Sequence, residues 1–331
     1  MEPDLFSSFE KAMTSQQQQW IRPYTKGETC GGHQFVLFLK PEVTAVHLGV
    51  DTPAIAKMVL ERLTAFEVSV HAMRALPAAY LSDHNIMDQH YGVINAISKN
   101  GEAALTEAAR ENLHQDFASE IKEGAIILGG HQFLEAQPNF SPLALSVFND
   151  NVGTTKLGGG SYCMKLEVLG QVYLLLNPFH AYQLVPYTTG DSAILVFECR
   201  STRDWADLRG KLTGSTNPET AVPGSIRAEL LARQEEFNLP AVNQGTNGVH
   251  LSAGPLEGMV ELQRFFSDHE TGTALNWSDT HFGESLIQKG KTEEELCILA
   301  KNPSVSWNGT TESAFDLTEE VNAEDALERL I

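Results

Sequence analysis

Apolar and polar residues form alternating blocks between residues 34 and 91, and these blocks predict strands and helices in turn. The run Phe35-Val-Leu-Phe-Leu39 is continuously apolar and stops at Lys40-Pro41. This is typical of a buried strand, because proline cannot donate a hydrogen bond to a neighbouring strand. Apolar residues at helical spacing predict a helix over 52–66, a second strand over 68–73 follows it, and another helix is expected over 82–91.

The same pattern resumes near residue 193. Ala193-Ile-Leu-Val-Phe197 predicts a third strand, and a helix is expected from 201 to about 209 with Ser201 or Thr202 as its cap. A long loop covers 214–224, Val249 lies in a short fourth strand, and Pro255 suits the first turn of a helix that runs to about 266. We therefore expect an α+β fold with a ferredoxin-like βαββαβ core, an antiparallel sheet with helices on one face.

The residues between these two parts have a different pattern and predict an inserted α+β subdomain. An Ala- and Glu-rich segment over 101–116 reads as a helix, and Leu169-Gly170 between two apolar runs suits a hairpin turn. Strands are predicted over 125–128, 143–148 and 162–168.

The two ends of the chain complete the predicted organisation. A polar arm over 1–33 contains a short amphipathic helix near 5–13, and an acidic extension over 269–331 ends in a helix over 322–330. The arm is followed by a discontinuous core made of 34–91 and 174–268, which is interrupted by the insert over 92–173.

Composition narrows the choice of partners and compartment. With 23 Lys and Arg against 43 Asp and Glu, the formal charge is −20, which argues against binding nucleic acid or an anionic membrane through the overall field. Any phosphate site must then be built locally. Four scattered cysteines show no zinc or disulfide spacing, and no apolar stretch is long enough to span a bilayer, so we expect a soluble, cytoplasmic protein.

One histidine has a setting that suits nucleophilic chemistry. His250 lies in a stretch of small and polar residues, Asn247-Gly-Val-His-Leu-Ser-Ala-Gly254, which we expect to form a turn, and Glu261 follows eleven positions later. Neutral imidazole is a nucleophile near pH 7 when a second group orients the ring through its other nitrogen. Any single histidine among the 11 is more commonly a surface or capping residue, so only its companions can support this hypothesis.

Those companions are cations and a hydroxyl at scattered positions. Lys40 ends the first predicted strand, Arg209 ends a predicted helix, and Thr216 and Arg227 frame the loop before the histidine. Phosphoryl transfer depends on positioning and charge neutralisation, which such groups supply. Taken singly, each residue also suits a solvated surface charge or a turn.

A series of short motifs follows one order along the chain. The motifs are Lys40-Pro41-Glu42, His90-Tyr91, Pro178-Phe179, Gly214-Ser-Thr-Asn-Pro218, Pro223-Gly-Ser-Ile-Arg227, Asn247-x-x-His250-x-Ser252 and Glu261 ahead of Phe265-Phe266. In their order and spacing, the chain resembles nucleoside diphosphate kinases, and the resemblance covers roughly 34–91 and 174–268.

The resemblance implies an activity and a set of roles. His250 would take the γ-phosphoryl group of a nucleoside triphosphate and pass it to a nucleoside diphosphate in a ping-pong cycle, with Mg²⁺ bridging the phosphates. The family also implies a homo-oligomer. Lys40, Tyr91, Arg209, Thr216 and Arg227 would hold the phosphates and sugar, Asn247 would reach the ribose side, Glu261 and Ser252 would orient the imidazole, and Phe179 would stack on any base.

Several departures from the family pattern lie close to the histidine. Glu42 replaces an aspartate, Leu251 replaces a glycine, and Ala253 stands where the family carries aspartate, so the turn loses a cap and gains bulk. Arg209 sits one residue farther than expected from the loop at 214–218. The loop before Asn247 is enlarged, and the insert separates Tyr91 from Pro178 by 87 positions.

These departures leave two alternatives open. The protein could be a nucleotide-binding sensor or assembly module with weak turnover, or a His250 phosphotransferase with an acceptor other than a nucleotide. The insert suits either a lid or an assembly element.

Overall fold

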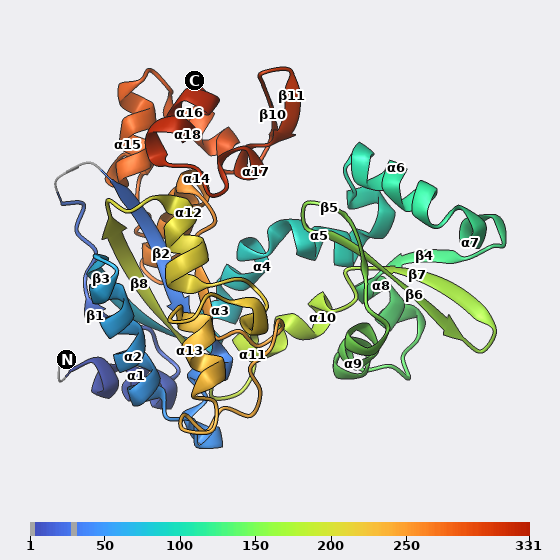
Figure 1. Cartoon of the computed structure of the whole chain (residues 1–331), viewed down its shortest axis with the longest axis horizontal. Coiled ribbons are helices and arrows are strands. Elements are labelled where there is room, and N and C mark those ends of the chain that lie inside the picture. Colours follow the sequence, from blue (N-terminus) through green and yellow to red (C-terminus); the bar gives the residue numbers. More distant parts are fainter. Residues whose placement is uncertain (1–3, 28–31) are drawn as a thin grey trace. The chain divides into compact units, whose positions relative to one another are not determined.

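The computed structural model describes residues 4–27 and 32–331 (Figure 1). They divide into two compact units, the first made of residues up to 84 together with 189–331, and the second of residues 85–188. The predicted limits of the insert, at 91/92 and 173/174, thus lie within the second unit. Residues 1–3 and 28–31 of the predicted polar arm lie outside the described residues.

The first unit is organised around a 5-stranded sheet with the order β1-β3-β8-β2-β9. All neighbouring strands are antiparallel, and β8 lies between β2 and β3, which are joined through helix α2. This is the predicted ferredoxin-like core, with β1 added at one edge by the N-terminal arm. The strands are β1 (Gln19–Arg22), β2 (His33–Leu39), β3 (Ser69–Pro77), β8 (Ala193–Ser201) and β9 (Val249–Leu251).

Helices cover both faces of this sheet, whereas the sequence predicted helices on one face. Phe35 and Leu37 of β2 share a buried cluster with α1 (Asp4–Ser15), α2 (Thr52–Ala65) and α13 (Ile226–Ala232). Phe38 points to the opposite face, because side chains alternate along a strand, and it contacts Phe265 of α14 (Pro255–Phe266) with ring centroids 5.4 Å apart. All seven residues of β2 are buried, and its apolar run over 35–39 is typical of a strand covered on both faces.

Two predicted helices differ from the structure. The helix expected over 82–91 is two short helices, α3 (Ala78–Asp83) and α4 (Ile86–His90), separated at Asn85, whose φ is +51°. The helix expected from 201 begins at Trp205, because Ser201 still belongs to β8; it runs as α12 (Trp205–Asp207) into a π-helical turn, η4 (Leu208–Thr213). Arg209 lies within that turn and does not end a helix.

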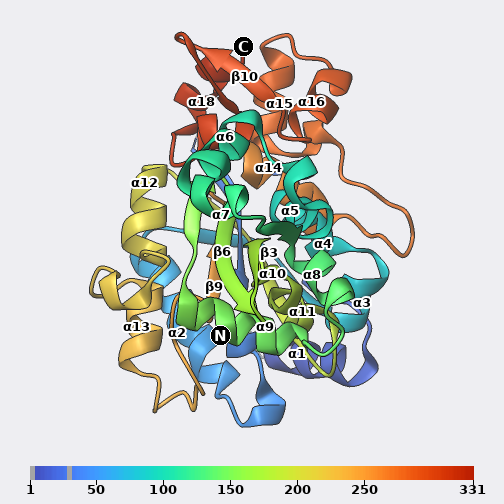
Figure 2. The same ribbon diagram turned by 90° about the vertical axis from the view of Figure 1, so that its right-hand side faces the viewer.

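The C-terminal extension packs on α14. Leu256, Met259 and Val260 of α14 form one buried cluster with apolar residues of the extension, among them Leu317 and Leu330. The extension consists of η6 (Trp277–Asp279), α15 (His281–Gln288), α16 (Glu293–Leu299), β10 (Ser304–Trp307), β11 (Thr310–Ser313), α17 (Ala314–Thr318) and α18 (Ala323–Leu330). Figures 1 and 2 show α15, α16 and α18 close to α14. Short 3₁₀ helices of the first unit are η1 (Pro41–Val43), η2 (Val46–Leu48) and η5 (Pro218–Thr220).

The second unit has a 4-stranded sheet of its own with the order β4-β7-β6-β5, in which β4 is parallel to β7. The hairpin turn at Leu169-Gly170 is confirmed, since both residues have positive φ between paired strands. The strands are β4 (Ile126–Gly129), β5 (Thr155–Gly158), β6 (Ser161–Val168) and β7 (Gln171–Leu176). The helices are α4, α5 (Gly92–Asn100), η3 (Gly101–Ala104), α6 (Glu107–Asp116), α7 (Ala118–Lys122), α8 (Gly130–Ala136), α9 (Pro142–Val152), α10 (His180–Gln183) and α11 (Val185–Thr188).

The strand predicted over 143–148 is wrong, because that segment lies in α9. The Ser141 side chain accepts a hydrogen bond from Ala144 N, and Pro142 occupies the first helical position. A serine cap followed by proline at the first helical position favours the start of a helix, even where an apolar run follows. The helix predicted over 101–116 is likewise divided, into η3 and α6.

No helix of the described residues is both long and apolar enough to cross a membrane.

One glycine of the core allows a test of how tightly β9 is seated. Gly248 has φ +78°, and a Cβ there would overlap the Leu230 side chain and lie 2.9 Å from Val43 Cγ1. We expect Gly248→Ala to lower the free energy of unfolding by about 2–4 kcal/mol, through backbone strain and overpacking together. Gly49→Ala is the control, because Gly49 has φ +83° with nothing within 4 Å, and its cost should stay at about 1–2 kcal/mol. Urea unfolding of both variants measures the difference, and equal losses would contradict the close packing.

Candidate active site

The sequence predicts a turn around His250. In the structure, His250 is instead the middle residue of strand β9. It pairs in register with Phe38 of β2. Because side chains alternate, Val249 and Leu251 point into the core, where both are fully buried, and His250 points to the face covered by α14. The bulk of Leu251 is therefore directed away from the imidazole.

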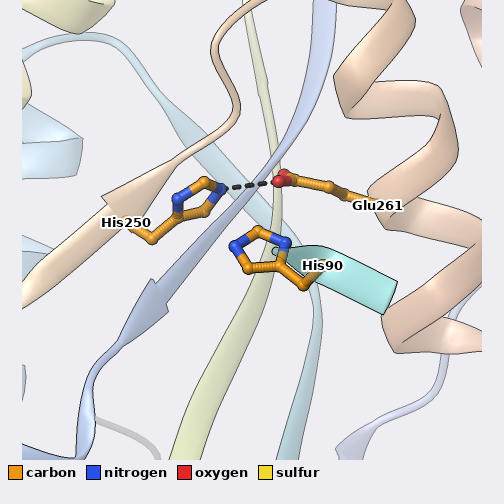
Figure 3. A group of neighbouring side chains, drawn as sticks. All are labelled: His90, His250 and Glu261. Carbon is orange, nitrogen blue, oxygen red and sulfur yellow. Dashed lines mark hydrogen bonds and ion pairs between the residues drawn. The ribbon is translucent and has the colours of Figure 1, made fainter. Parts of the chain in front are cut away.

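A chain of hydrogen bonds fixes one edge of the His250 ring. Figure 3 shows His250 Nε2 facing Glu261 of α14, with 2.7 Å between Nε2 and Glu261 Oε1. The Ser252 hydroxyl donates to the other carboxylate oxygen at 2.5 Å, and Val36 N donates to Ser252 Oγ at 3.0 Å. Glu261 is fully buried, whereas the His250 side chain is 17% exposed. The hydrogen bonds of Glu261 thus join strand β9, the turn after it and helix α14.

The face of the imidazole is also supported. The Phe38 ring stacks on His250 with centroids 4.6 Å apart and an interplanar angle of 21°. Phe38 is itself fixed by Phe265 of α14. With its edge bonded and one face stacked, the ring has little freedom to rotate.

Lys40 and Asn247 meet where β2 ends beside β9. Lys40 Nζ donates to Asn247 Oδ1 at 2.8 Å. The Glu42 carboxylate accepts from Gly248 N at 3.0 Å, so the longer side chain at this position reaches the loop before His250. The motif that follows the first strand is thus joined to the histidine strand at two points.

Arg227 and the loop at 214–224 are tied to the same strand. Arg227 donates from Nη1 to Gly214 O at 2.8 Å and from Nη2 to Val249 O at 3.0 Å. Asn247 Nδ2 donates to Thr216 O at 3.2 Å, while Thr216 itself is exposed. Residues that lie far apart in sequence are thus brought to one end of β9.

Arg209 lies on the other side of His250. Its Nη1 donates to Leu251 O at 2.9 Å. Its remaining nitrogens face two carboxylates of the C-terminal extension, with Nη2 3.6 Å from Glu319 Oε1 and Nε 3.6 Å from Glu320 Oε1.

The electrostatics favour a neutral imidazole. Burial, followed by the positive charges of Arg209, Lys40 and Arg227, holds the pKa of His250 well below its usual value. Burial lowers the pKa of the Lys40 ammonium to about 8. Burial also raises the pKa of Glu261 to about 7, although the Ser252 hydrogen bond acts in the opposite direction.

Sequence reasoning missed Glu257. Its carboxylate accepts from Ala253 N at 2.7 Å and so caps the turn that lacks an aspartate at position 253. Burial, then the nearby Glu261 carboxylate, raises the pKa of Glu257 to about 7. Glu257 and Glu261 are four residues apart on a helix and therefore share a face. This spacing is the sequence signal that could have identified Glu257.

Tyr91 and Phe179 belong to the second unit. The Tyr91 hydroxyl lies 3.4 Å from the Tyr187 hydroxyl. Phe179 packs edge-on against Tyr162, with centroids 5.8 Å apart. Their roles toward a nucleotide stay predictions.

The raised pKa of Glu257 predicts a stability that changes with pH. The folded protein retains the proton between about pH 4.5 and 7, and above that range it must ionise a largely buried carboxyl. Glu257→Gln removes this cost and keeps an acceptor for Ala253 N. We expect its free energy of unfolding to exceed that of the wild type by about 1–2 kcal/mol at about pH 8, and to match it near pH 4.5.

Urea unfolding across this pH range measures the difference. Glu312→Gln, at an exposed position of β11, is the control and should show no trend with pH. A gain for Glu257→Gln that is the same at both pH values would contradict ionisation as its cause.

A scan against models of known protein families finds no match for the chain. The chain is 31% identical over 121 residues to a nucleoside diphosphate kinase of Desulfotalea psychrophila, covering 36% of this chain and 78% of that protein. It is 33% identical over 94 residues to a nucleoside diphosphate kinase of Herpetosiphon aurantiacus, covering 28% of this chain and 54% of that protein.

Among solved structures, the chain is similar to an NDP kinase from Pyrobaculum aerophilum, with 17% identity, a TM-score of 0.36, and coverage of 73% of this chain and 99% of that one. Through the relative matched over 78% of its length, the chain belongs to the nucleoside diphosphate kinase family.

Proposed function

We propose that the protein is a phosphotransferase of the nucleoside diphosphate kinase type, which moves the γ-phosphoryl group of a nucleoside triphosphate to a nucleoside diphosphate through a phosphohistidine at His250. The observation that carries the proposal is the hydrogen-bonded series His250, Glu261 and Ser252, at 2.7 and 2.5 Å. An imidazole that is oriented in this way, and kept neutral by its surroundings, has the properties of a nucleophile.

The chemistry follows from which ring nitrogen faces the carboxylate. Nε2 faces Glu261, so we propose that Nε2 carries the proton and that Nδ1 is the phosphoryl acceptor. The Nδ1 lone pair forms the N–P bond while the P–O bond to the departing nucleoside diphosphate breaks. Positive charge that develops on the ring is stabilised by the Glu261 carboxylate. A second nucleoside diphosphate then attacks the phosphorus and restores the neutral imidazole.

The surrounding groups suit the charge of the substrate. We propose that Lys40, Arg209 and Arg227 neutralise the phosphates, that Thr216 and Asn247 position phosphate and ribose, and that Tyr91 and Phe179 contact the nucleotide as in the family. Charge neutralisation and positioning provide most of the catalysis in phosphoryl transfer. A homo-oligomer and a cytoplasmic location stay predictions.

Mg²⁺ is the cofactor that the family implies. The groups named around His250 are mainly ammonium, guanidinium, amide and hydroxyl groups, and the Glu261 carboxylate already contacts His250 and Ser252. This set suits phosphates better than a resident divalent cation, so we propose that Mg²⁺ binds together with the nucleotide, through its phosphate oxygens. Bound with the nucleotide, Mg²⁺ would neutralise part of the phosphate charge.

The direct test is formation of the phosphoenzyme. Incubated with γ-labelled ATP and Mg²⁺, the wild type should acquire an acid-labile, alkali-stable label, whereas His250→Ala should acquire none, because it lacks the nucleophile. Chasing with several nucleoside diphosphates should remove the label. Absence of label on the wild type would refute the proposal, and a label that resists every nucleoside diphosphate would indicate a different acceptor.

The role of Glu261 predicts a distinctive pH profile. Because Glu261 ionises near pH 7, the rate of His250 phosphorylation should rise as the pH passes through about 7. Glu261→Gln should lose this inflection and be slower by at least about tenfold, since the carboxylate no longer stabilises the charged ring. Glu257→Gln is the control and should keep the inflection; its loss in that variant would assign the ionisation to Glu257.

A further inference from the structure

Residues 318–322 of the C-terminal extension, here called the strap, contact the turn after His250 through their backbone. Glu320 N donates to Ala253 O at 2.8 Å. A Cβ at Gly254 would overlap Thr318 O, so the strap and the turn are in direct backbone contact. The packing of α17 on α14 holds the near end of the strap in place.

The far end of the strap is hydrogen-bonded to the start of α12, which leads into the π-helical turn that contains Arg209. Asn322 Oδ1 accepts from Trp205 N at 2.9 Å, and Asn322 Nδ2 donates to Asp204 Oδ1 at 2.9 Å. Asn322 thus caps the N-terminus of α12 from more than 100 residues away in sequence. Arg209 follows one turn later, so the strap contacts both the turn after His250 and the segment that leads to Arg209.

This attachment brings Glu319 and Glu320 to Arg209. Each has a carboxylate oxygen 3.6 Å from a guanidinium nitrogen, longer than a hydrogen bond. The two side chains are 46% and 51% exposed. Such pairs are weak and are readily replaced by a better anion. The other bond of Arg209, to Leu251 O, leaves the guanidinium beside His250.

We propose that Glu319 and Glu320 are specificity-determining residues that compete with nucleotide phosphate for Arg209 and so weaken binding of the more highly charged nucleotide. The inference rests on the proposed function, because it assigns Arg209 to phosphate. The carboxylates repel a triphosphate more than a diphosphate, since Coulomb energy scales with charge. They therefore reduce the preference of the site for the triphosphate over the diphosphate.

The test is binding to the full chain, measured by calorimetry with Mg²⁺ and two probes, ADP and the β,γ-imido analogue of ATP, which does not transfer its terminal group. In Glu319→Gln/Glu320→Gln we expect the Kd of the analogue to fall about three- to tenfold, and that of ADP to fall less. Raising the salt to about 0.5 M should reduce the difference, because exposed charges are screened.

The matched control is Glu293→Gln/Glu294→Gln, an adjacent exposed pair in α16 of the same extension. It changes the net charge by the same amount and should leave both Kd values unchanged. The inference would be overturned if the strap variant bound the analogue no more tightly than the wild type, or if its affinity for both probes rose equally. An equal rise in affinity in the control, or no binding by any variant, would also overturn it. A wild type that binds the analogue but forms no phosphohistidine would refute the proposed function alone.

Discussion

The contact between His250 and Glu261 is the constraint on which the rest of the site depends. It joins an edge strand of three residues to a helix on the opposite face of the sheet from the main core. Its geometry requires that β9 pair with β2 in one register, because a shift by one residue would turn His250 into the core and Leu251 toward α14. The burial of Val249 and Leu251 fixes that register and therefore also places the imidazole.

Charge around this contact is arranged locally, against the sign of the whole molecule. The chain carries a formal charge of −20, yet burial and then the positive charges of Arg209, Lys40 and Arg227 lower the pKa of His250. The acidic groups nearby are held in specific contacts: Glu261 with the imidazole and Ser252, Glu257 with the backbone of the turn, and the strap glutamates with Arg209. Cations are thus gathered around His250 within an acidic protein, and the neighbouring carboxylates are each held in a defined contact.

The departures from the family pattern have structural explanations. Leu251 occupies the core face of β9, so its bulk adds burial without crowding the imidazole. The turn that lost an aspartate at position 253 is capped by Glu257. The longer Glu42 still reaches the backbone of the loop at Gly248. The C-terminal extension, which packs on α14 and contacts the turn, has become part of the frame around the site.

The sequence by itself determined the elements whose signals are local. The strands of the core, the helix over 52–65 and the hairpin at Leu169-Gly170 could be predicted, because period, caps and turn residues act over a few positions. Where a short apolar run competed with a cap, as at Ser141-Pro142, the local pattern was ambiguous and the strand prediction failed. Only the tertiary structure decided that α14 covers the second face of the sheet, that Asn322 caps α12 and that Glu319 and Glu320 face Arg209. Those contacts join residues more than about a hundred positions apart, and no short-range pattern encodes them, because they arise when separate elements pack together.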